Sequence, residues 1–404
     1  MLSRCIGTDP QEFSRNHWGR YPLLSPAREL PRNFTDLLSS AAVDELLAER
    51  GVRAPFIRLA KDGSVLARDC YLGPAGFGAE VTDQVDPAGV LQQFAAGASI
   101  VLQGLHRLWP PVIDFVRAMV DDLGHPVQAN AYITPPSSRG FEAHYDVHDV
   151  FVLQTTGHKH WTVHAPVHAD PLPSQPWTEH RGAIARRVAD DEPVIDTVLA
   201  PGDALYLPRG WIHSARAQDT VSIHLTVGVS ATTRLDVVRA LVDQLADHEE
   251  FRSSLPMALD ATNRDEMVAT ATKILAELTA TLRDSTTELS EGVATRLTQQ
   301  YAERTRPVAV RPLAVFDAAE HSATVAVRWR GGLVATIGRH HGRVRLCLPD
   351  RTIDFPDVCA DALAALHRGS VMRADSLPGL DAADGAVVLS RLLREAVVVP
   401  VDHP

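Results

Sequence analysis

His144 and Asp146 are the residues whose types and spacing indicate chemistry most directly. They stand two apart in an alternating run, which predicts a strand with both side chains on one face. A third metal ligand must come from elsewhere, and the best candidate is His213, which follows the turn in PGDALYLPRGWIHSA. Two imidazoles and a carboxylate on one face of a metal ion are typical of non-haem Fe(II) sites that also hold a co-substrate and O2. The alternative is that His144 and Asp146 form a hydrogen-bonded pair in the core.

Lys159 is one of only three lysines, with Lys61 and Lys273, among 39 basic residues. It lies in a predicted strand between apolar runs. A buried cation requires an anion, and a diacid co-substrate would supply one. The alternative is a lysine on the outer face of the protein that pairs with a surface acid.

The short strands and loops that must position these residues indicate a barrel. Short strands separated by Pro, Gly and polar loops are typical of a double-sheet β-barrel. A helix is predicted over 109–123, with Gly124 as its stop. The loop from His164 to Arg187 is rich in Pro and His, and its length predicts a lid or a substrate wall.

The segment before the barrel mixes short helices and strands. A helix is predicted over 34–50, with Asn33 as its N-cap. A hairpin is predicted around the turn Lys61-Asp62-Gly63. This segment is expected to supply outer strands and one wall of the pocket.

A longer pattern connects these features: N-x-Y-I-T-P, then H-Y-D, V-F-V-L-Q, G-H-K-H-W, and P-G-D-x-L-Y-L-P-R-G-W-I-H. It resembles the JmjC/cupin oxygenases, and within them the ribosomal oxygenases, over about residues 98–229. The resemblance implies a double-stranded β-helix (jelly-roll) barrel. It also implies Fe(II) bound by His144, Asp146 and His213, with 2-oxoglutarate and O2 as co-substrates.

The resemblance also assigns residues around the co-substrate. Lys159 would hold the distal carboxylate of 2-oxoglutarate. Asn130 and Tyr132 alternate onto one face of a strand and would help to orient the co-substrate, as would His224 on the strand after the third ligand. The alternative for these three is an ordinary barrel interior. His148 and Asp149, directly after the motif, are expected to line the substrate mouth.

The sequence pattern changes after the barrel. The chain is therefore expected to form a mainly β fold with added α-helices, divided into three parts. Residues 1–230 are expected to form the JmjC/cupin catalytic domain. Residues 231–306 carry apolar stripes on predicted helices over 234–248 and 264–283. The resemblance implies that this helical region forms a homodimer; the alternative is that the stripes pack only within one chain. Residues 307–404 are expected to form a winged-helix-like domain, with strands over 325–329, 333–337 and 344–348 and helices over 358–367 and 381–394.

The net charge of the chain limits the classes of molecule that it is expected to bind. Residues 307–404 contain 11 Arg and 11 acidic residues, so this part has no net charge and is not expected to bind DNA. The whole chain carries a formal charge of −11, which disfavours nucleic acid and anionic membranes and would attract a basic ribosomal protein or peptide.

Composition indicates the compartment. The four cysteines are not arranged in C-x-x-C pairs, which suits a reducing compartment. No apolar segment resembles a signal peptide or a membrane span. The protein is therefore expected to be cytoplasmic.

The leading hypothesis is an Fe(II)- and 2-oxoglutarate-dependent hydroxylase of an amino-acid side chain in a protein or peptide. Three alternatives stay open. The first is a tailoring oxygenase of a small ribosomally made peptide. The second is a non-catalytic metal-binding cupin that acts as a sensor or scaffold. The third is demethylation of N-methylated lysine by the same iron chemistry.

Overall fold

The computed structural model describes residues 1–61, 63–78, 80–139 and 141–401. Its contacts divide the chain into two compact units, Met1–Ala231 and Thr232–Pro404. No helix within these described residues has both the length and the apolar character needed to cross a membrane.

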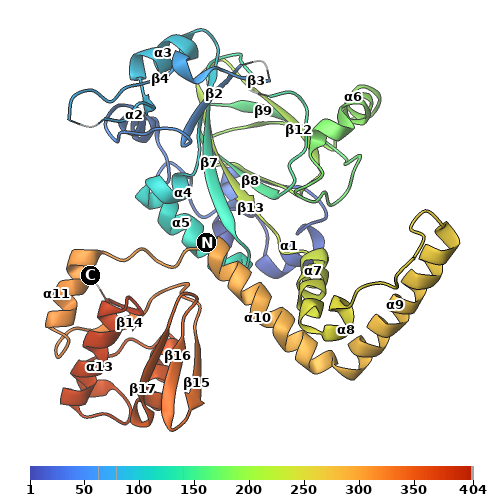
Figure 1. Ribbon diagram of the computed structural model, residues 1–404. Coiled ribbons are helices and arrows are strands. Elements are labelled where there is room, and N and C mark those ends of the chain that lie inside the picture. The colour runs from blue at the N-terminus through green and yellow to red at the C-terminus, as the bar shows by residue number, and fades with distance from the viewer. Residues whose placement is uncertain (62, 79, 140, 402–404) are drawn as a thin grey trace. The chain divides into compact units, whose positions relative to one another are not determined.

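The first unit is built on an eight-stranded antiparallel sheet with the strand order β1-β11-β8-β13-β7-β6-β2-β3. Figure 1 labels β8, β13, β7, β2 and β3 of this sheet. In the central strand β8 (Asp149–Thr156) every residue except the last is buried, because both faces of the sheet are covered. The other strands of this sheet are β1 (Leu23–Ser25), β2 (Ile57–Lys61), β3 (Ser64–Val65), β6 (Ser99–Leu102), β7 (Val127–Thr134), β11 (Ala204–Leu207) and β13 (Ser222–Val229).

A second sheet has the order β10-β9-β12, formed by Ile195–Leu199, Lys159–His164 and Ile212–Ala217. Apolar side chains from both sheets form one core, in which Val150 and Val152 of β8 cluster with Trp161 and Val163 of β9. This arrangement confirms the predicted double-sheet barrel. A short ribbon, β4 (Leu72–Gly73) with β5 (Gln84–Val85), lies outside these sheets.

Capping explains where the helices of this unit begin and end. Helix α5 (Pro110–Leu123) begins with Pro at its first position and ends at Gly124, whose φ of 68° closes it as predicted. The helix predicted over 34–50 is shorter than expected: α2 spans Ser40–Ala48 and is capped by Ser39. Asn33 does not cap it, because its side chain accepts hydrogen bonds from Thr35 instead. The other helices are α1 (Pro10–Asn16), α3 (Pro87–Ala95), α4 (Leu105–Leu108) and α6 (Arg181–Asp190).

Two local predictions in this unit have different outcomes. The hairpin is present, because β2 pairs with β3 through Ala60 with Val65 and Lys61 with Ser64; Asp62 of its turn lies outside the described residues. The strand predicted through His144 and Asp146 is wrong, because β8 begins only at Asp149.

The second unit begins with helices α7 (Arg234–Gln244), α8 (Glu249–Arg252), α9 (Arg264–Asp284) and α10 (Thr286–Arg304). Helix α7 ends four residues before the predicted end at residue 248, and α9 closely follows its predicted span. Asn263 caps α9 by accepting from the main-chain N–H groups of Asp265 and Glu266. None of the 21 residues of α9 is buried in this single chain.

The rest of the second unit contains helices around two small antiparallel sheets. The sheets are β14 (Val327–Trp329) with β18 (Val398–Pro400), and β15 (Thr336–His340), β16 (Arg343–Cys347) and β17 (Thr352–Pro356). The helices are α11 (Pro312–Glu320), α12 (Ala360–His367) and α13 (Ala382–Arg394). The strand predicted over 333–337 begins later, because Leu333 belongs to a turn that its N–H closes onto the carbonyl of Arg330. Residues 402–404 lie outside the described part.

Candidate metal centre and its pocket

Two segments that are distant in sequence bring the predicted triad together. His144 and Asp146 lie in the loop before β8, and His213 is the second residue of β12. Potential ligand atoms of the three residues all lie within 4.8 Å of one another, and Nε2 of His213 is 3.7 Å from a carboxylate oxygen of Asp146. This spacing is suitable for three ligands around one ion, so the residues form a candidate metal centre.

Both imidazoles are oriented by the main chain. Nδ1 of His144 lies 2.7 Å from the carbonyl oxygen of Glu142, and Nδ1 of His213 lies 3.0 Å from that of Trp211. When each Nδ1–H donates to its carbonyl, each Nε2 keeps a lone pair for a metal. Such outer hydrogen bonds fix the tautomer and the ring orientation of histidine ligands.

The electrostatics also suit a divalent cation. Burial, followed by the neighbouring His144, lowers the pKa of His213 and keeps that imidazole neutral. Burial alone would raise the pKa of Asp146, but His213, His148 and His144 outweigh it and hold the pKa below its usual value. The neutral imidazole of His213 and the ionised carboxylate of Asp146 are the states that metal binding requires. The residues therefore fit the ion that the sequence implies.

Lys159, the first residue of β9, is only 4% exposed. Its Nζ donates to Oγ1 of Thr134 over 3.0 Å, and Ser99 donates to the same oxygen over 3.2 Å. Among the described residues it forms no ion pair, and burial lowers the pKa of Lys159 to about 7. The outer-face alternative is therefore wrong, and the structure contains a buried lysine that has no carboxylate partner among the described residues.

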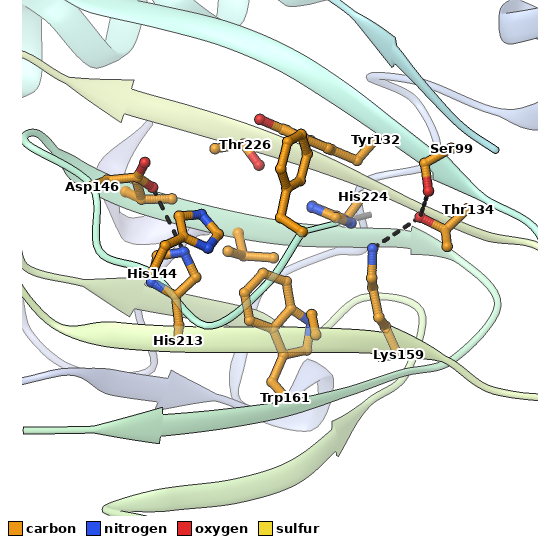
Figure 2. Close-up of a pocket in the computed structure, with 14 residues that line it drawn as sticks. Ser99, Tyr132, Thr134, His144, Asp146, Lys159, Trp161, His213, His224 and Thr226 are labelled. Atoms are coloured by element: carbon orange, nitrogen blue, oxygen red, sulfur yellow. Dashed lines mark hydrogen bonds and ion pairs between the residues drawn. The ribbon is translucent and has the colours of Figure 1, made fainter. Parts of the chain in front are cut away.

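The triad and Lys159 line one pocket from opposite ends. Figure 2 shows His144, Asp146 and His213 together at one end, with Lys159, Thr134 and Ser99 at the other. A molecule that bound the metal with one group and carried a carboxylate at its far end would satisfy both. A 2-oxo diacid has this form.

Aromatic rings form the walls between these two ends. The rings of Tyr132 and His224 stack in parallel with centroids 5.1 Å apart, and Trp161 meets His224 edge-on at 5.5 Å. His224 is buried, its Nδ1 has no hydrogen-bond partner among the described residues, and burial followed by Lys159 lowers its pKa well below the usual value. Burial followed by Asp146 raises the pKa of Tyr132 and keeps it a neutral phenol.

Asn130 does not lie where the alternation of side chains along its strand predicts. Its side-chain oxygen accepts a hydrogen bond from the N–H of Gly104 over 2.9 Å. It lines an adjoining cavity together with Tyr132 and His148, rather than the pocket that holds Lys159. The expectation that Asp149 lines the mouth is wrong, because Asp149 is buried and accepts a hydrogen bond from the hydroxyl of Tyr206 over 3.0 Å.

The segment 164–187, predicted as a loop, contains a 3-10 helix and the first part of α6, and it approaches the triad. Trp177, in a short 3-10 helix before α6, places its ring centroid 5.9 Å from that of His144. The guanidinium of Arg181 lies over the same tryptophan at 4.4 Å. This contact is consistent with the predicted substrate wall.

Several pocket residues were not identified from the sequence. Thr134 shares the alternating face of Asn130 and Tyr132, and Trp161 stands two residues after Lys159, so both had a detectable signal. Ser99 had none, because its place depends on the register in which β6 pairs with β7. The other missed residues that line the pocket are Phe141, Val150, Val152, Ala215 and Thr226.

Comparisons with known proteins agree with this geometry. Residues 110–237 match the family model for a JmjC domain, a segment that contains the triad and Lys159. The chain is 32% identical to ribosomal oxygenase 1 of Gallus gallus over 256 residues, which are 61% of this chain and 40% of that protein. It is 33% identical to ribosomal oxygenase 1 of Homo sapiens over 258 residues, or 61% and 38% of the two chains.

The curated relatives also include the bifunctional lysine-specific demethylase and histidyl-hydroxylase NO66 of Aedes aegypti. It is 29% identical over 265 residues, which are 62% of this chain and 39% of the relative. This chain therefore spans about two fifths of the length of each of these three curated relatives.

Solved structures extend the likeness over nearly the whole chain. The ribosomal oxygenase YcfD of Escherichia coli aligns with a TM-score of 0.53 at 18% identity and covers 98% of both chains. A structure of YcfD in complex with cobalt and 2-oxoglutarate aligns with a TM-score of 0.52, at 18% identity over 98% of this chain and 99% of that one. At this identity the likeness shows the fold.

Proposed function

We propose that this chain, which contains a JmjC domain similar to that of the ribosomal oxygenases, is an Fe(II)- and 2-oxoglutarate-dependent oxygenase. It would hydroxylate an amino-acid side chain in a protein or peptide. One observation carries this proposal: one pocket has a triad of metal-binding type at one end and, at the other, a buried Lys159 that forms no ion pair within the described part of the chain. This combination requires both a cation and an anion.

Each residue has a defined task in this proposal. His144, Asp146 and His213 would hold Fe(II) on one face. Lys159 would pair with the distal carboxylate of 2-oxoglutarate, and Thr134 would position its ammonium through the hydrogen bond between them. Iron with 2-oxoglutarate and O2 supplies the conversion of a C–H bond to C–OH, coupled to the release of succinate and CO2.

The walls would control access and orientation. Tyr132 and His224, both neutral and stacked, would confine the co-substrate between the triad and Lys159. Trp161 and Phe141 would exclude water from the reacting centre. Asn130 would act from the adjoining cavity, where its side-chain oxygen holds the N–H of Gly104.

The names of the relatives suggest a ribosomal protein as the substrate. A small ribosomally made peptide is the alternative that shares the same site. A non-catalytic scaffold would not need Lys159 to be buried without an anion. Hydroxylation and lysine demethylation use the same pocket and differ in the target residue.

The domain assignment belongs to the same proposal. Residues 1–230 would be catalytic, residues 231–306 would form a homodimer through helices such as α9, and residues 307–404 would form a winged-helix-like domain. The exposed apolar side chains of α9 and the three helices beside a small antiparallel sheet support this assignment. The absence of net charge in residues 307–404 supports a role other than DNA binding. We place the protein in the cytoplasm on the basis of its cysteine usage.

The test is conversion of 2-oxoglutarate to succinate by the Fe(II)-loaded protein, followed by NMR. We expect slow succinate formation without substrate, acceleration by the correct peptide or ribosomal protein, and a gain of one oxygen in that substrate by mass spectrometry. The variant His144→Ala should form no succinate. A wild type that forms none with Fe(II), ascorbate and ribosomal protein fractions would contradict the proposal.

A further inference from the structure

A second cavity, of about 460 Å³, adjoins the metal centre. It shares three lining residues with the co-substrate pocket: Tyr132, Asp146 and Thr226. The remaining walls come from β2, α4, the segments just before each of them, β7 and the loop that carries His148. This size is within the range of sites that enclose small ligands, and one metal ligand is exposed to the cavity. A substrate side chain in this cavity would therefore lie directly beside the metal.

The charged groups of this cavity are nearly all basic. The two guanidiniums of Arg58 and Arg107 line it together with the imidazoles of His106 and His148, and among the described lining residues the one carboxylate is Asp146 of the metal triad. Among the described residues, neither Arg58 nor Arg107 forms an ion pair. The two guanidiniums therefore give the cavity a positive potential that no wall carboxylate outside the triad neutralises.

Arg58 is the more enclosed of the two guanidiniums. Its Nε is buried and has no hydrogen-bond partner among the described residues. Its guanidinium lies 5.6 Å from the ring centroid of Phe141 and interacts with the hydroxyl of Tyr132. A buried donor without an acceptor is costly to leave unpaired, so a ligand that offers an acceptor to Arg58 would gain from meeting it.

Side-chain amides complete the wall. Gln103 and Gln128 line the cavity next to Asn130, whose amide oxygen is already engaged by Gly104. Amides can pair with polar side chains and with peptide groups, but they carry no charge that would offset the arginines.

We infer that this cavity receives the target residue of the substrate and selects a neutral or anionic side chain that presents a hydrogen-bond acceptor, such as a carboxamide, a carboxylate or a neutral imidazole. It would disfavour arginine, lysine and N-methylated lysine, because a cation would be desolvated beside two guanidiniums. The inference rests on the proposed function, since it names the class of residue that the oxygenase would modify.

This local selectivity differs from the effect of the overall charge. A formal charge of −11 attracts basic proteins at long range. The cavity acts at contact distance. It therefore discriminates between substrates by the charge of the target side chain and not by the charge of the whole substrate protein. A basic ribosomal protein could therefore be attracted as a whole and still present a non-cationic residue to the metal.

The test uses six biotinylated peptide pools that differ only at the central position, which is Asn, Asp, His, Arg, Lys or dimethyl-lysine. The three residues on each side are mixtures of uncharged amino acids. Binding to the protein is measured by biolayer interferometry, with and without Mn(II) and 2-oxoglutarate. Succinate formation is measured separately with Fe(II) and the same pools.

We expect the Asn, Asp and His pools to bind about tenfold or more tightly than the Arg, Lys and dimethyl-lysine pools, a factor that one favourable polar contact can supply. The variant Arg58→Gln should reduce this preference. Arg107→Glu, whose side chain is exposed and can change without disturbing the core, should reduce or reverse it. The matched control is Arg28→Glu, an arginine whose side chain is 80% exposed and lines neither cavity, and it should keep the wild-type preference.

Equal or tighter binding of the cationic pools by the wild type would overturn the inference, as would an unchanged preference in both arginine variants. Succinate formation that is fastest with the arginine or lysine pools would also overturn it while leaving the oxygenase activity established. Loss of succinate formation with every pool, with the binding preference intact, would instead count against the proposed function and support the selectivity.

Discussion

The main chains of His144 and His213 hydrogen-bond to each other in both directions, with N–H to O distances between heavy atoms of 3.1 and 2.8 Å. Their imidazole centroids lie 4.6 Å apart. The ligand loop is therefore held to β12 by backbone hydrogen bonds that do not involve the ligand side chains. Metal binding can consequently be removed by changing a side chain while the bridge remains.

His144→Ala is expected to abolish metal binding at this site and leave the fold intact. Loss of one of three ligands should weaken Mn(II) binding by at least about 100-fold, more than is typical for changes to outer partners of a ligand. The measurement is calorimetric titration of Mn(II), with circular dichroism as the check on folding. His160→Ala, a half-exposed histidine on β9 that pairs with Asp196, is the matched control and should bind Mn(II) normally. Wild-type affinity in His144→Ala would remove the triad assignment.

The turn that leads into Lys159 requires glycine at position 157. Gly157 has a φ of 65°, and a Cβ there would lie 2.1 Å from the carbonyl oxygen of Val221. Gly157→Ala should therefore destabilise the protein by more than the roughly 1–2 kcal/mol that left-handed backbone alone costs an L-residue. Gly124→Ala is the control, because Gly124 has a similar φ of 68° with nothing within 4 Å of its Cβ position. Equal losses of stability in urea unfolding of the two variants would contradict the steric argument.

The predictable parts of this site were those encoded in short stretches of sequence. His144, Asp146 and Lys159 stand in local patterns whose chemistry is unusual, and Gly124 ends α5 for a local reason. The errors arose where distant segments decide the outcome. His144 and Asp146 do not lie in a regular strand, since His213 pairs with the loop at only one position.

The positions of other residues depend on which strands pair, and the periodicity of the sequence does not reveal this pairing. Ser99 reaches Thr134 because β6 pairs with β7, and Arg58 reaches Tyr132 because β2 lies beside β6. Asp149 follows the motif directly and was expected at the mouth, but β8 turns it into the core, where Tyr206 provides its hydrogen bond.

Helix α9 is expected to be buried by a second copy of the chain. It contains no buried residue in the single chain, and Val268 and Leu275 are 54% and 60% exposed. A charge on the predicted stripe, in Leu278→Glu, should shift the protein toward monomer in sedimentation velocity at micromolar concentration. Lys273→Glu, a charge reversal at a residue of α9 whose side chain is 80% exposed, should leave the distribution unchanged. A monomeric wild type under these conditions would contradict the dimer.

The affinity for 2-oxoglutarate should fall as pH rises above about 7. Burial lowers the pKa of Lys159 from 10.5 to about 7 in the free protein, and a bound carboxylate would favour the charged ammonium again. Binding then takes up a proton above that pH, so the dissociation constant should increase by up to about tenfold per pH unit and be flat below it.

The same linkage predicts that the free protein becomes more stable as pH rises from about 7 toward 10.5, since the unfolded lysine keeps its proton in that window. Lys159→Met should remove both dependences, measured by titration and by urea unfolding across pH. Lys61→Met, at an exposed lysine of β2, should keep them. A pH-independent dissociation constant in the wild type would exclude this titration of Lys159.

The most direct test of the account is titration of 2-oxoglutarate into the Mn(II)-loaded wild type and the Lys159→Ala variant. Lys159 is buried and forms no ion pair with any residue that the structure describes, so a bound diacid would be its partner. Its removal should weaken 2-oxoglutarate by about 2–4 kcal/mol while the affinity for Mn(II) changes much less. Lys159→Arg should retain part of the affinity, because it keeps the charge without the compact shape. An unchanged dissociation constant for 2-oxoglutarate in Lys159→Ala would contradict the central claim that the triad and Lys159 form the two ends of one co-substrate site.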